Sequence, residues 1–356
     1  MGAWLPRNQN IWEHPRNTSK QNILTDKDKV YNKITAMPSF DYTTGQAFFR
    51  DSFVPFKDAN VSIASSPVLY GLSVYTVFSV NWNEAEKKRY AFRLKDHYRR
   101  LVNSAAIMDF NTFAAAWPYE KFEATMRELV RRNAAEGEDI LVRATVFVDA
   151  LIAGTKIHDL PQALSAYAYP MGTILPRAGV NMCVSSWTHN FDNVIPSRAK
   201  VNGGYVNNSL IKNEAILNGY DDAIVLDVNG RVTEATVANI FIVRNGVLIT
   251  PGVSVDILEG ITRASVIAIA RDAGIPVEER TVDRTELYIA DEAFISGSSA
   301  RITPIMSVDK RPVGAAAAAA GTAMVPGPIT KIISEKYAAA QQGTDGGKYT
   351  AWRMEI

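Results

Sequence analysis

The sequence predicts a mixed α/β protein with two domains. At 356 residues the chain is longer than a typical single domain, and its hydrophobic content of 47% is ample for two cores. Strand-like runs and amphipathic helical segments fill both halves, without the regular βαβ alternation of a doubly wound parallel sheet. Between the halves, proline and glycine cluster from Pro161 to Gly179, which indicates a connection between domains.

These observations predict four parts of the chain. Polar residues with little periodicity at the N-terminus favour an extension, lying on the surface or on a partner subunit, over a separate domain. The expected parts are an N-terminal extension at 1–40, a small α/β domain at 41–167, an interdomain loop at 168–178 and a large domain at 179–356.

Composition excludes several functional classes. The formal net charge is +1 and charged residues make up 21%, so neither a nucleic acid nor a membrane surface is an expected partner. No apolar run approaches the length of a membrane span, and the first twenty residues lack a signal-peptide core, so we expect a cytoplasmic protein.

Cys183, the single cysteine, is expected to be a small buried hydrophobic residue rather than a reactive thiol. The four scattered histidines predict no metal site.

Hydrophobic periodicity predicts the elements of the first half. β-branched and aromatic runs indicate strands, and apolar residues at helical spacing indicate helices. The predicted strands are 61–63, 68–78 and 140–147, and the predicted helices are 95–108 and 119–133.

In the second half, two Asn-Gly pairs are the strongest turn signals. Asn229-Gly230 and Asn245-Gly246 each predict a tight hairpin between antiparallel strands. The run Ala315–Ala320 is a helix or a flexible loop. The remaining predicted strands are 182–187, 222–227, 232–234, 238–243, 277–282 and 293–295, and the predicted helices are 204–218, 262–273 and 329–339.

Lys200 is the first candidate for chemistry. It precedes Gly203-Gly204 and the predicted helix that follows them. A lone lysine is by default a solvated surface residue. A lysine amine also forms imines with carbonyl compounds, and the downstream segments offer groups that suit an aromatic aldehyde phosphate. We therefore interpret Lys200 as the Schiff-base partner of pyridoxal phosphate, with the freed amine moving a proton once substrate displaces it.

Glu234 is the candidate partner of the pyridine nitrogen. It is a lone carboxylate on a predicted strand whose neighbours are apolar, and a protonated ring nitrogen requires a carboxylate beside it. An exposed strand residue beside a hairpin is the alternative interpretation.

A phosphate group requires oriented N–H donors and positive charge. The helix start at Ile261-Thr262 supplies free backbone N–H groups, and Ser298 and Ser299 lie in a predicted turn. Arg100 is a candidate counter-ion because guanidinium forks match phosphate geometry. The alternatives are a threonine that only caps its helix, ordinary turn serines and a solvated arginine.

Taken together, the ordered motifs from Ala199 to Thr303 resemble the fold-type IV aminotransferases, whose best-known members are the branched-chain and D-amino-acid aminotransferases. The resemblance extends more weakly to 70–75 and to the helix of Arg100, so it covers most of the chain after about residue 45. The matching pieces are Ala199-Lys200-x-x-Gly-Gly204-Tyr205, Leu226-Asp227-x-Asn-Gly230-x-Val-Thr-Glu234, Gly260-Ile261-Thr262-Arg263 and Ser296-Gly297-Ser298-Ser299-Ala-x-Ile302-Thr303-Pro304.

The resemblance implies the two-domain fold of the D-amino-acid aminotransferases, pyridoxal phosphate as cofactor, a homodimer, and a small-molecule amino donor and oxo-acid acceptor. It makes Lys200 the Schiff-base lysine, Tyr205 the phenol near the cofactor's ring oxygen, and Glu234 the partner of the ring nitrogen. The branched-chain enzymes are the closer subgroup because Lys200-x-x-Gly-x-Tyr205 is their pattern. The implied phosphate-binding residues are Arg100, Ile261, Thr262 and Ser298.

Substrate residues depart from the branched-chain pattern. Tyr75-Thr76-Val77 stands where Phe-Glu-Gly is usual, and Leu141-Val142-Arg143 keeps only the arginine of Tyr-x-Arg. Pro170-Met171-Gly172 stands where a tryptophan commonly lines the pocket. Arg143 is either a ligand of the substrate carboxylate or a charge at a strand edge. The predicted substrate-binding residues are Tyr70, Tyr75, Val77, Leu141, Arg143, Ser299 and Ala300.

Four functions follow, in order of preference. The first is transfer of an amino group from a hydrophobic L-amino acid to 2-oxoglutarate or another 2-oxo acid. The second is an (R)-amine or D-amino-acid transaminase, which the more apolar half-pocket of Val77 and Leu141 would favour. The third is a lyase of the aminodeoxychorismate type, and the fourth is a non-catalytic cofactor-binding protein. The order of these substrates is based on analogy with proteins of the same fold.

Overall fold

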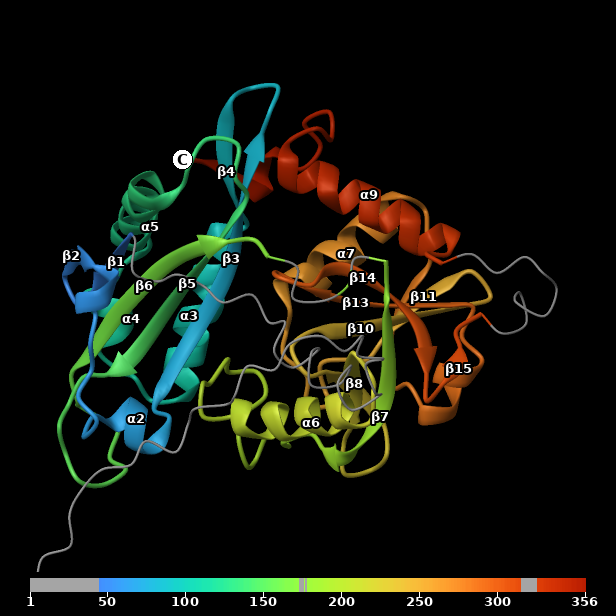
Figure 1. The fold of residues 1–356 in the computed structure, drawn as a ribbon, viewed down its shortest axis with the longest axis horizontal. Helices are drawn as coiled ribbons and strands as arrows, with labels where there is room; N and C mark the ends of the chain where they lie inside the picture. Colours follow the sequence, from blue (N-terminus) through green and yellow to red (C-terminus); the bar gives the residue numbers. More distant parts are fainter. Residues whose placement is uncertain (1–44, 173–175, 177, 315–324) are drawn as a thin grey trace, which may run out of the picture. The chain divides into compact units, whose positions relative to one another are not determined.

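The computed structural model describes residues 45–172, 176, 178–314 and 325–356. These residues belong to one compact unit that contains two β-sheets, each covered by helices (Figure 1). The predicted extension at 1–40 and the alanine run at 315–320 lie outside the described residues.

The first sheet is wholly antiparallel and has seven strands in the order β16-β4-β3-β5-β6-β1-β2. Its longest strand, β3, pairs with β5 from Ser73–Phe147 to Val80–Ile140. The strands are β1 (Gln46–Phe49), β2 (Ser52–Pro55), β3 (Ser73–Asn83), β4 (Lys88–Phe92), β5 (Ile140–Val148), β6 (Gln162–Pro170) and β16 (Arg353–Glu355).

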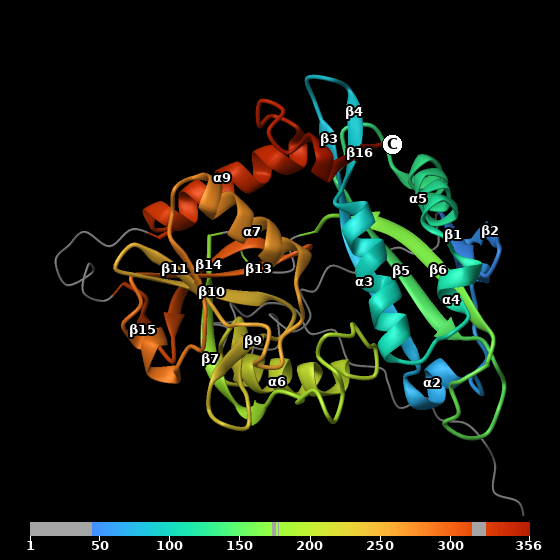
Figure 2. The same ribbon diagram turned by 180° about the vertical axis from the view of Figure 1, so that it is seen from behind.

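Alternation along these strands separates a core face from a face that carries polar groups. Even-numbered residues such as Phe78 and Val142 are buried in one hydrophobic core with side chains of helices α3 and α5. Figure 2 shows α3 lying in front of β3 and β5 on this side. Odd-numbered residues such as Tyr75 and Arg143 therefore point to the opposite side. The helices of this half are α2 (Ser66–Tyr70), α3 (Leu94–Ile107), α4 (Phe113–Ala116) and α5 (Tyr119–Asn133), with the 3-10 turn η1 (Phe56–Asp58).

The second sheet has nine strands and closes on itself. Strand β10 pairs with β13 on one side and with β9 on the other, so β10-β13-β14-β7-β8-β9 form a ring. Inward-facing apolar residues, among them Ile240 and Ile295, fill it. The strands are β7 (Val180–Thr188), β8 (Asp222–Leu226), β9 (Val232–Ala235), β10 (Asn239–Arg244), β11 (Val247–Thr250), β12 (Val277–Glu279), β13 (Glu292–Gly297), β14 (Arg301–Val308) and β15 (Arg311–Pro312).

Three long helices cover the second sheet. Helix α6 packs on β7 and β8, whereas α7 and α9 pack on each other and on β13 (Figure 1). Helix α9 also contacts β3 and β4 of the first sheet, where Phe92 meets Tyr337 edge to face. The elements are α6 (Tyr205–Leu217), α7 (Ile261–Asp272) and α9 (Pro328–Gln342), with the 3-10 turns η2 (Arg284–Tyr288) and η3 (Thr350–Trp352).

The structure confirms all five predicted helices to within a few residues and both Asn-Gly hairpins. The second hairpin joins β10 to β11, and its Asn245 and Gly246 have φ angles of 50° and 77°. A tight turn with two positive φ angles twists in the same sense as the strands beside it. Local sequence was sufficient at these places.

One predicted strand was wrong, and another was right only in part. Residues 61–63 form no strand, and the run 68–78 is a strand only from Ser73, because Ser66–Tyr70 form helix α2. Pro67 at the first turn favours that helix, and Gly71, with φ of 67°, ends it. Strand β6 was not predicted, since prolines bound it; it covers the first three residues of the predicted loop at 168–178.

Candidate active site

A cavity of about 440 Å³ is lined by residues of both sheets and of the segments that join them. Most side chains selected from the sequence line it. They are Tyr75, Val77, Arg100, Arg143, Lys200, Tyr205, Glu234, Ile261, Thr262, Ser298 and Ser299.

Three predicted substrate residues are not among those that line the cavity. Tyr70 is 39% exposed, and its hydroxyl oxygen accepts a 3.1 Å hydrogen bond from the N–H of Gly154. Leu141 is buried on the same face of β5 as Arg143, two residues along the strand, and Ala300 is buried in the turn after β13. Their substrate contacts stay predictions.

Lys200 lies on a segment fixed to the edge of β3. Its carbonyl accepts a 3.0 Å hydrogen bond from the N–H of Tyr75, and its own N–H donates to Ser104 Oγ at 3.1 Å. The following residue, Val201, forms a bridge with Val74. The lysine backbone is therefore held at both its donor and its acceptor.

Close backbone approach explains Gly71, which lies against the segment that follows this lysine. A Cβ added to Gly71 would lie 2.7 Å from Cα of Gly203, nearer than real Cβ atoms approach. Gly71 also has the positive φ that glycine adopts without strain. The pair lets the Lys200 segment reach β3 at the point where that strand begins.

The Lys200 amine donates a 2.7 Å hydrogen bond to the hydroxyl oxygen of Tyr205. Burial would raise the pKa of Tyr205, but the charge and hydrogen bond of Lys200 outweigh it, and the pKa is lowered. The Tyr75 ring lies 5.4 Å from the Tyr205 ring. Burial, with the neighbouring Tyr205, holds the pKa of Tyr75 well above its usual range. Of the two phenols, Tyr205 is the one whose pKa is lowered, because the Lys200 amine lies beside it.

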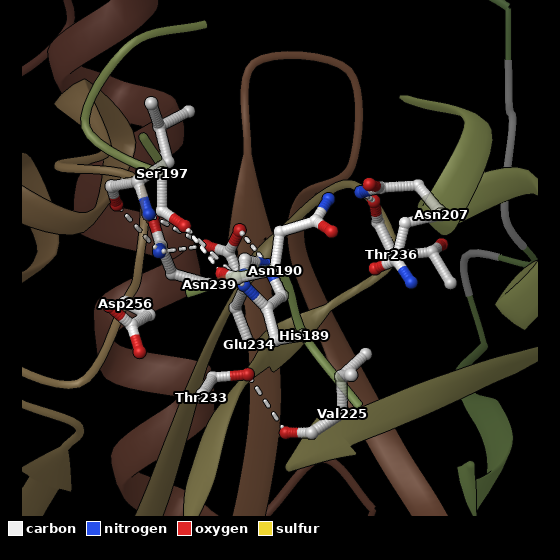
Figure 3. A network of polar contacts seen from close by, with 12 residues as sticks. His189, Asn190, Ser197, Asn207, Val225, Thr233, Glu234, Thr236, Asn239 and Asp256 are labelled. Carbon is white, nitrogen blue, oxygen red and sulfur yellow. Dashed lines mark hydrogen bonds and ion pairs between the residues drawn. The ribbon is translucent and has the colours of Figure 1, made fainter. Parts of the chain in front are cut away.

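Glu234, on β9, also lines the cavity, and Figure 3 shows it close to His189 and Asn239. Its Oε2 accepts hydrogen bonds from Asn239 Nδ2 at 2.9 Å and from the N–H of Leu258 at 3.2 Å. Its Oε1 lies 3.4 Å from His189 Nε2. The carboxylate is thus anchored through one oxygen while it lines the cavity.

Asn239 connects this carboxylate to the start of helix α7. Its Nδ2 also donates to the carbonyl of Leu258 at 2.9 Å, and a Cβ on Gly260 would lie only 2.0 Å from Asn239 Oδ1. Gly260 is the residue before the helix, and no side chain caps it. Only a residue without a Cβ fits there while Asn239 keeps its place.

Two sets of hydrogen-bond donors without a partner line the cavity, one on Arg100 and one in the first turn of α7. Arg100 Nη2 donates to Thr76 Oγ1 at 3.3 Å, but its Nε is buried without a partner. Burial, opposed by Tyr205, Tyr75 and Glu234, lowers the pKa of Arg100 to about 10. The backbone N–H groups in the first turn of a helix also have no intrahelical acceptor. These donors beside one cavity fit an anionic group such as phosphate.

Arg143 faces the cavity from β5. Its guanidinium lies 3.6 Å from the centroid of the Tyr75 ring and donates to Asn202 Oδ1. Within the described residues it forms no ion pair with a carboxylate, so its charge is available to a ligand.

The sequence alone did not reveal two polar residues of the site, His189 and Asn239. Asn239 falls in a predicted strand, where a polar residue before an apolar run was the available signal. His189 is one of the four scattered histidines that predict no metal site, and no other signal in the sequence singles it out. In the described part of the chain no group of three or more His, Cys, Asp or Glu residues could hold a metal ion. Nor does that part contain a helix long and apolar enough to cross a membrane.

The family model for class IV aminotransferases matches residues 73–308, which is more than half of the chain. A probable branched-chain-amino-acid aminotransferase of Aquifex aeolicus is 38% identical over 314 residues, which cover 87% of this chain and 96% of that protein.

Several crystal structures are similar, two of them as follows. One is the branched-chain aminotransferase of Thermoproteus uzoniensis with norvaline, with a TM-score of 0.79, 36% identity, and coverage of 87% of this chain and 99% of that one. The other is the Thermobaculum terrenum enzyme in its PLP form, with a TM-score of 0.77, 33% identity, and coverage of 88% and 99%. The match spans the cavity-lining residues from Tyr75 to Ser299, and the chain therefore belongs to the class IV aminotransferases.

Proposed function

We propose that this chain is a pyridoxal-phosphate transaminase that moves an amino group from a hydrophobic, branched-chain-type amino acid to 2-oxoglutarate or another 2-oxo acid. We also propose that it acts as a homodimer, in the cytoplasm that the composition predicts. One observation carries the proposal: the Lys200 amine and the Glu234 carboxylate line the same cavity as a set of unpartnered anion donors.

Different groups that line the cavity suit different parts of the cofactor. The Lys200 amine is the group that would hold the aldehyde carbon, and Glu234 would accept a hydrogen bond from the ring nitrogen. Arg100 and the N–H groups at Ile261 and Thr262, with Ser298, would hold the phosphate. The PLP form of the Thermobaculum terrenum enzyme supports this cofactor for a chain of the same fold.

When bound, pyridoxal phosphate supplies a conjugated ring that withdraws electrons from the carbon losing its proton. The chain supplies the rest. With cofactor and substrate bound, Lys200 Nζ would be the group that takes the proton from the substrate Cα and donates it again as the amino group is transferred. Tyr205 accepts a hydrogen bond from this amine and so orients it. Glu234 would accept a hydrogen bond from the protonated ring nitrogen.

Arg143 is the proposed ligand for the substrate carboxylate, since its charge faces the cavity without an acidic partner in the described residues. Val77 lies directly opposite Arg143 on the next strand and gives an apolar surface for the side chain. The branched-chain relatives, one of them with norvaline, support hydrophobic amino acids as donors.

Exposed apolar side chains support the homodimer. On helix α6, Val206 is 67% exposed and Leu217 61%, and Leu69 and Tyr70 of α2 are also exposed. Large apolar side chains that are exposed in one chain are of the kind that a protein interface covers. A second copy is the proposed occupant because the family resemblance implies one.

A scan of amino donors tests the proposed reaction. Purified protein is loaded with pyridoxal phosphate and mixed separately with L-leucine, L-glutamate, D-alanine or (R)-1-phenylethylamine. The absorbance of the bound cofactor at about 400 nm is followed after each addition. Bleaching by the L-amino acids supports the proposal. Bleaching only by the (R)-amine or D-alanine would replace it with the second candidate, and pyruvate formed without an acceptor would indicate the lyase. Loss of the response in Lys200→Ala, with the fold kept, would confirm the lysine.

A further inference from the structure

His189 lies beside Glu234 and has no role in the reaction described so far (Figure 3). It follows strand β7, and its N–H donates to the carbonyl of Leu226 at 2.9 Å, which extends the pairing of β7 with β8. Its side chain is 8% exposed and lines the cavity. The imidazole is therefore fixed in place next to the site.

The contacts of His189 define where one proton lies. Its Nδ1 is 2.9 Å from the carbonyl oxygen of Asn190, which can only accept, so Nδ1 carries a hydrogen. Ser197 Oγ donates to the same carbonyl at 3.0 Å and holds it. With Nδ1 assigned as donor, the charge of the ring depends on Nε2 alone.

Nε2 lies 3.4 Å from Glu234 Oε1. The other oxygen, Oε2, already has two donors, from Asn239 and from the backbone at Leu258. If Nε2 carried no proton, its lone pair would face the lone pairs of Glu234 Oε1. Two acceptors that face each other in a buried site raise the free energy, because neither has a donor. A proton on Nε2 turns the same contact into an ion pair.

We infer that His189 is a positioning residue: protonated on Nε2, it keeps Glu234 ionised and holds the Oε1 side of the carboxylate in place at the cavity. The inference rests on the proposed function, because Glu234 acts there on the ring nitrogen. Burial opposes the charge on His189, but the hydrogen bond and charge of Glu234 outweigh it, and its pKa is raised. Asp256, from the loop before α7, adds to this effect.

The charge on His189 matters because Glu234 has two possible states when a protonated ring nitrogen faces it. The proton can stay on the ring, or it can move to the carboxylate and leave a neutral pair. A cation in contact with the carboxylate favours its ionised form. His189 therefore keeps the shared proton on the ring nitrogen, where it promotes loss of the substrate proton.

The first experiment measures the proton directly. The full-length protein, with and without pyridoxal phosphate, is labelled with 15N-histidine, and the ring signals are followed against pH. The chain has four histidines, so single substitutions assign each signal. We expect both nitrogens of His189 to be protonated at neutral pH, and Glu234→Gln to lower the His189 pKa by about 1 or more. A His189 ring that is neutral at pH 7 in the wild-type protein would overturn the inference.

The second experiment separates charge from packing. His189→Gln keeps a donor without a charge, and His189→Leu removes both. Loss of a hydrogen bond to a charged group predicts about tenfold weaker binding of pyridoxal phosphate in His189→Leu, and a smaller loss in His189→Gln. In wild-type protein kcat should fall as pH rises through the His189 pKa, and that fall should be absent in His189→Gln while the donor KM is unchanged. An unaltered pH profile in His189→Gln would refute the role.

His158 supplies the matched control. It also pairs with a carboxylate, Asp109, at 2.8 Å, but the pair is exposed and does not line the cavity. His158→Gln should change neither cofactor affinity nor the pH profile, and an effect equal to that of His189→Gln would refute the inference. If wild-type protein binds no pyridoxal phosphate, the proposed function fails, whereas the labelled-histidine experiment still decides whether the pair shares a proton.

Discussion

The Nζ of Lys200 lies 2.7 Å from the hydroxyl oxygen of Tyr205, the first residue of helix α6. The lysine is fixed to β3 through its backbone, and the tyrosine is fixed by its helix. The distance between the two groups is therefore set by the short segment with Gly203 that joins them. The Lys200 side chain is flexible, and its hydrogen bond to Tyr205 fixes the orientation of the amine.

Tyr205→Phe should slow transamination without unfolding the protein. The substitution removes the acceptor of the Lys200 hydrogen bond, and such bonds to charged groups contribute about 1.5–3 kcal/mol, or about 10- to 100-fold in kcat. Steady-state kinetics with a saturating donor measure the change. Tyr220→Phe is the control, because that ring lies away from the cavity, and a Tyr205→Phe rate equal to that of the control would contradict the contact's role.

Arg143→Gln should raise KM for amino and oxo acids by about 10- to 100-fold, because a charged hydrogen bond to the carboxylate is lost. A primary amine without a carboxylate, which makes no such contact, should react as before. Comparison of the two substrate classes on one variant therefore provides its own control. An unchanged KM for every oxo acid would show that Arg143 binds no carboxylate.

Local signals account for what could be predicted of the fold. The helices of Leu101 and Phe122 have apolar residues at helical spacing, and the hairpins have Asn-Gly pairs, so neighbours along the chain determine them. Helix α2 and strand β6 were missed because local propensity was ambiguous there. A β-branched run after Pro67 favoured a strand, and prolines around β6 favoured a loop.

The candidate site shows the same division. Lys200 and Glu234 could be selected because each is unusual in its own segment, and the family motifs order them. His189 could not, since its role depends on a contact between the end of β7 and β9, which adjacent residues do not encode. For Tyr70 the sequence motif is present, but the side chain does not line the cavity. In the single chain it is partly exposed to solvent and its hydroxyl contacts Gly154.

Gly260→Ala should weaken cofactor binding and lower stability. The new Cβ would lie 2.0 Å from Asn239 Oδ1, so Asn239 must move, and Glu234 Oε2 would lose a donor. Loss of that bond predicts about tenfold weaker binding of pyridoxal phosphate, measured by absorbance titration.

Gly252→Ala is the control for this variant. Gly252 lies in the same loop, where the nearest atoms to an added Cβ are 3.9 Å away, so the substitution should be neutral or slightly stabilising. Equal cofactor affinity in the two alanine variants would contradict the coupling of Gly260 to Glu234 through Asn239.

Glu292→Ala should lower the free energy of unfolding by about 1–3 kcal/mol. Helix α9 has Gly327 as its N-cap residue and no capping side chain of its own, but Glu292 of β13 accepts hydrogen bonds from the N–H groups of Ile329 at 3.0 Å and Thr330 at 2.7 Å. The alanine leaves both donors of the first turn without an acceptor. Denaturant unfolding of the cofactor-free protein measures the loss, and Glu335→Ala, on the exposed face of the same helix, should change the free energy by less than about 0.5 kcal/mol. Equal midpoints for the two variants would show that Glu292 does not cap the helix.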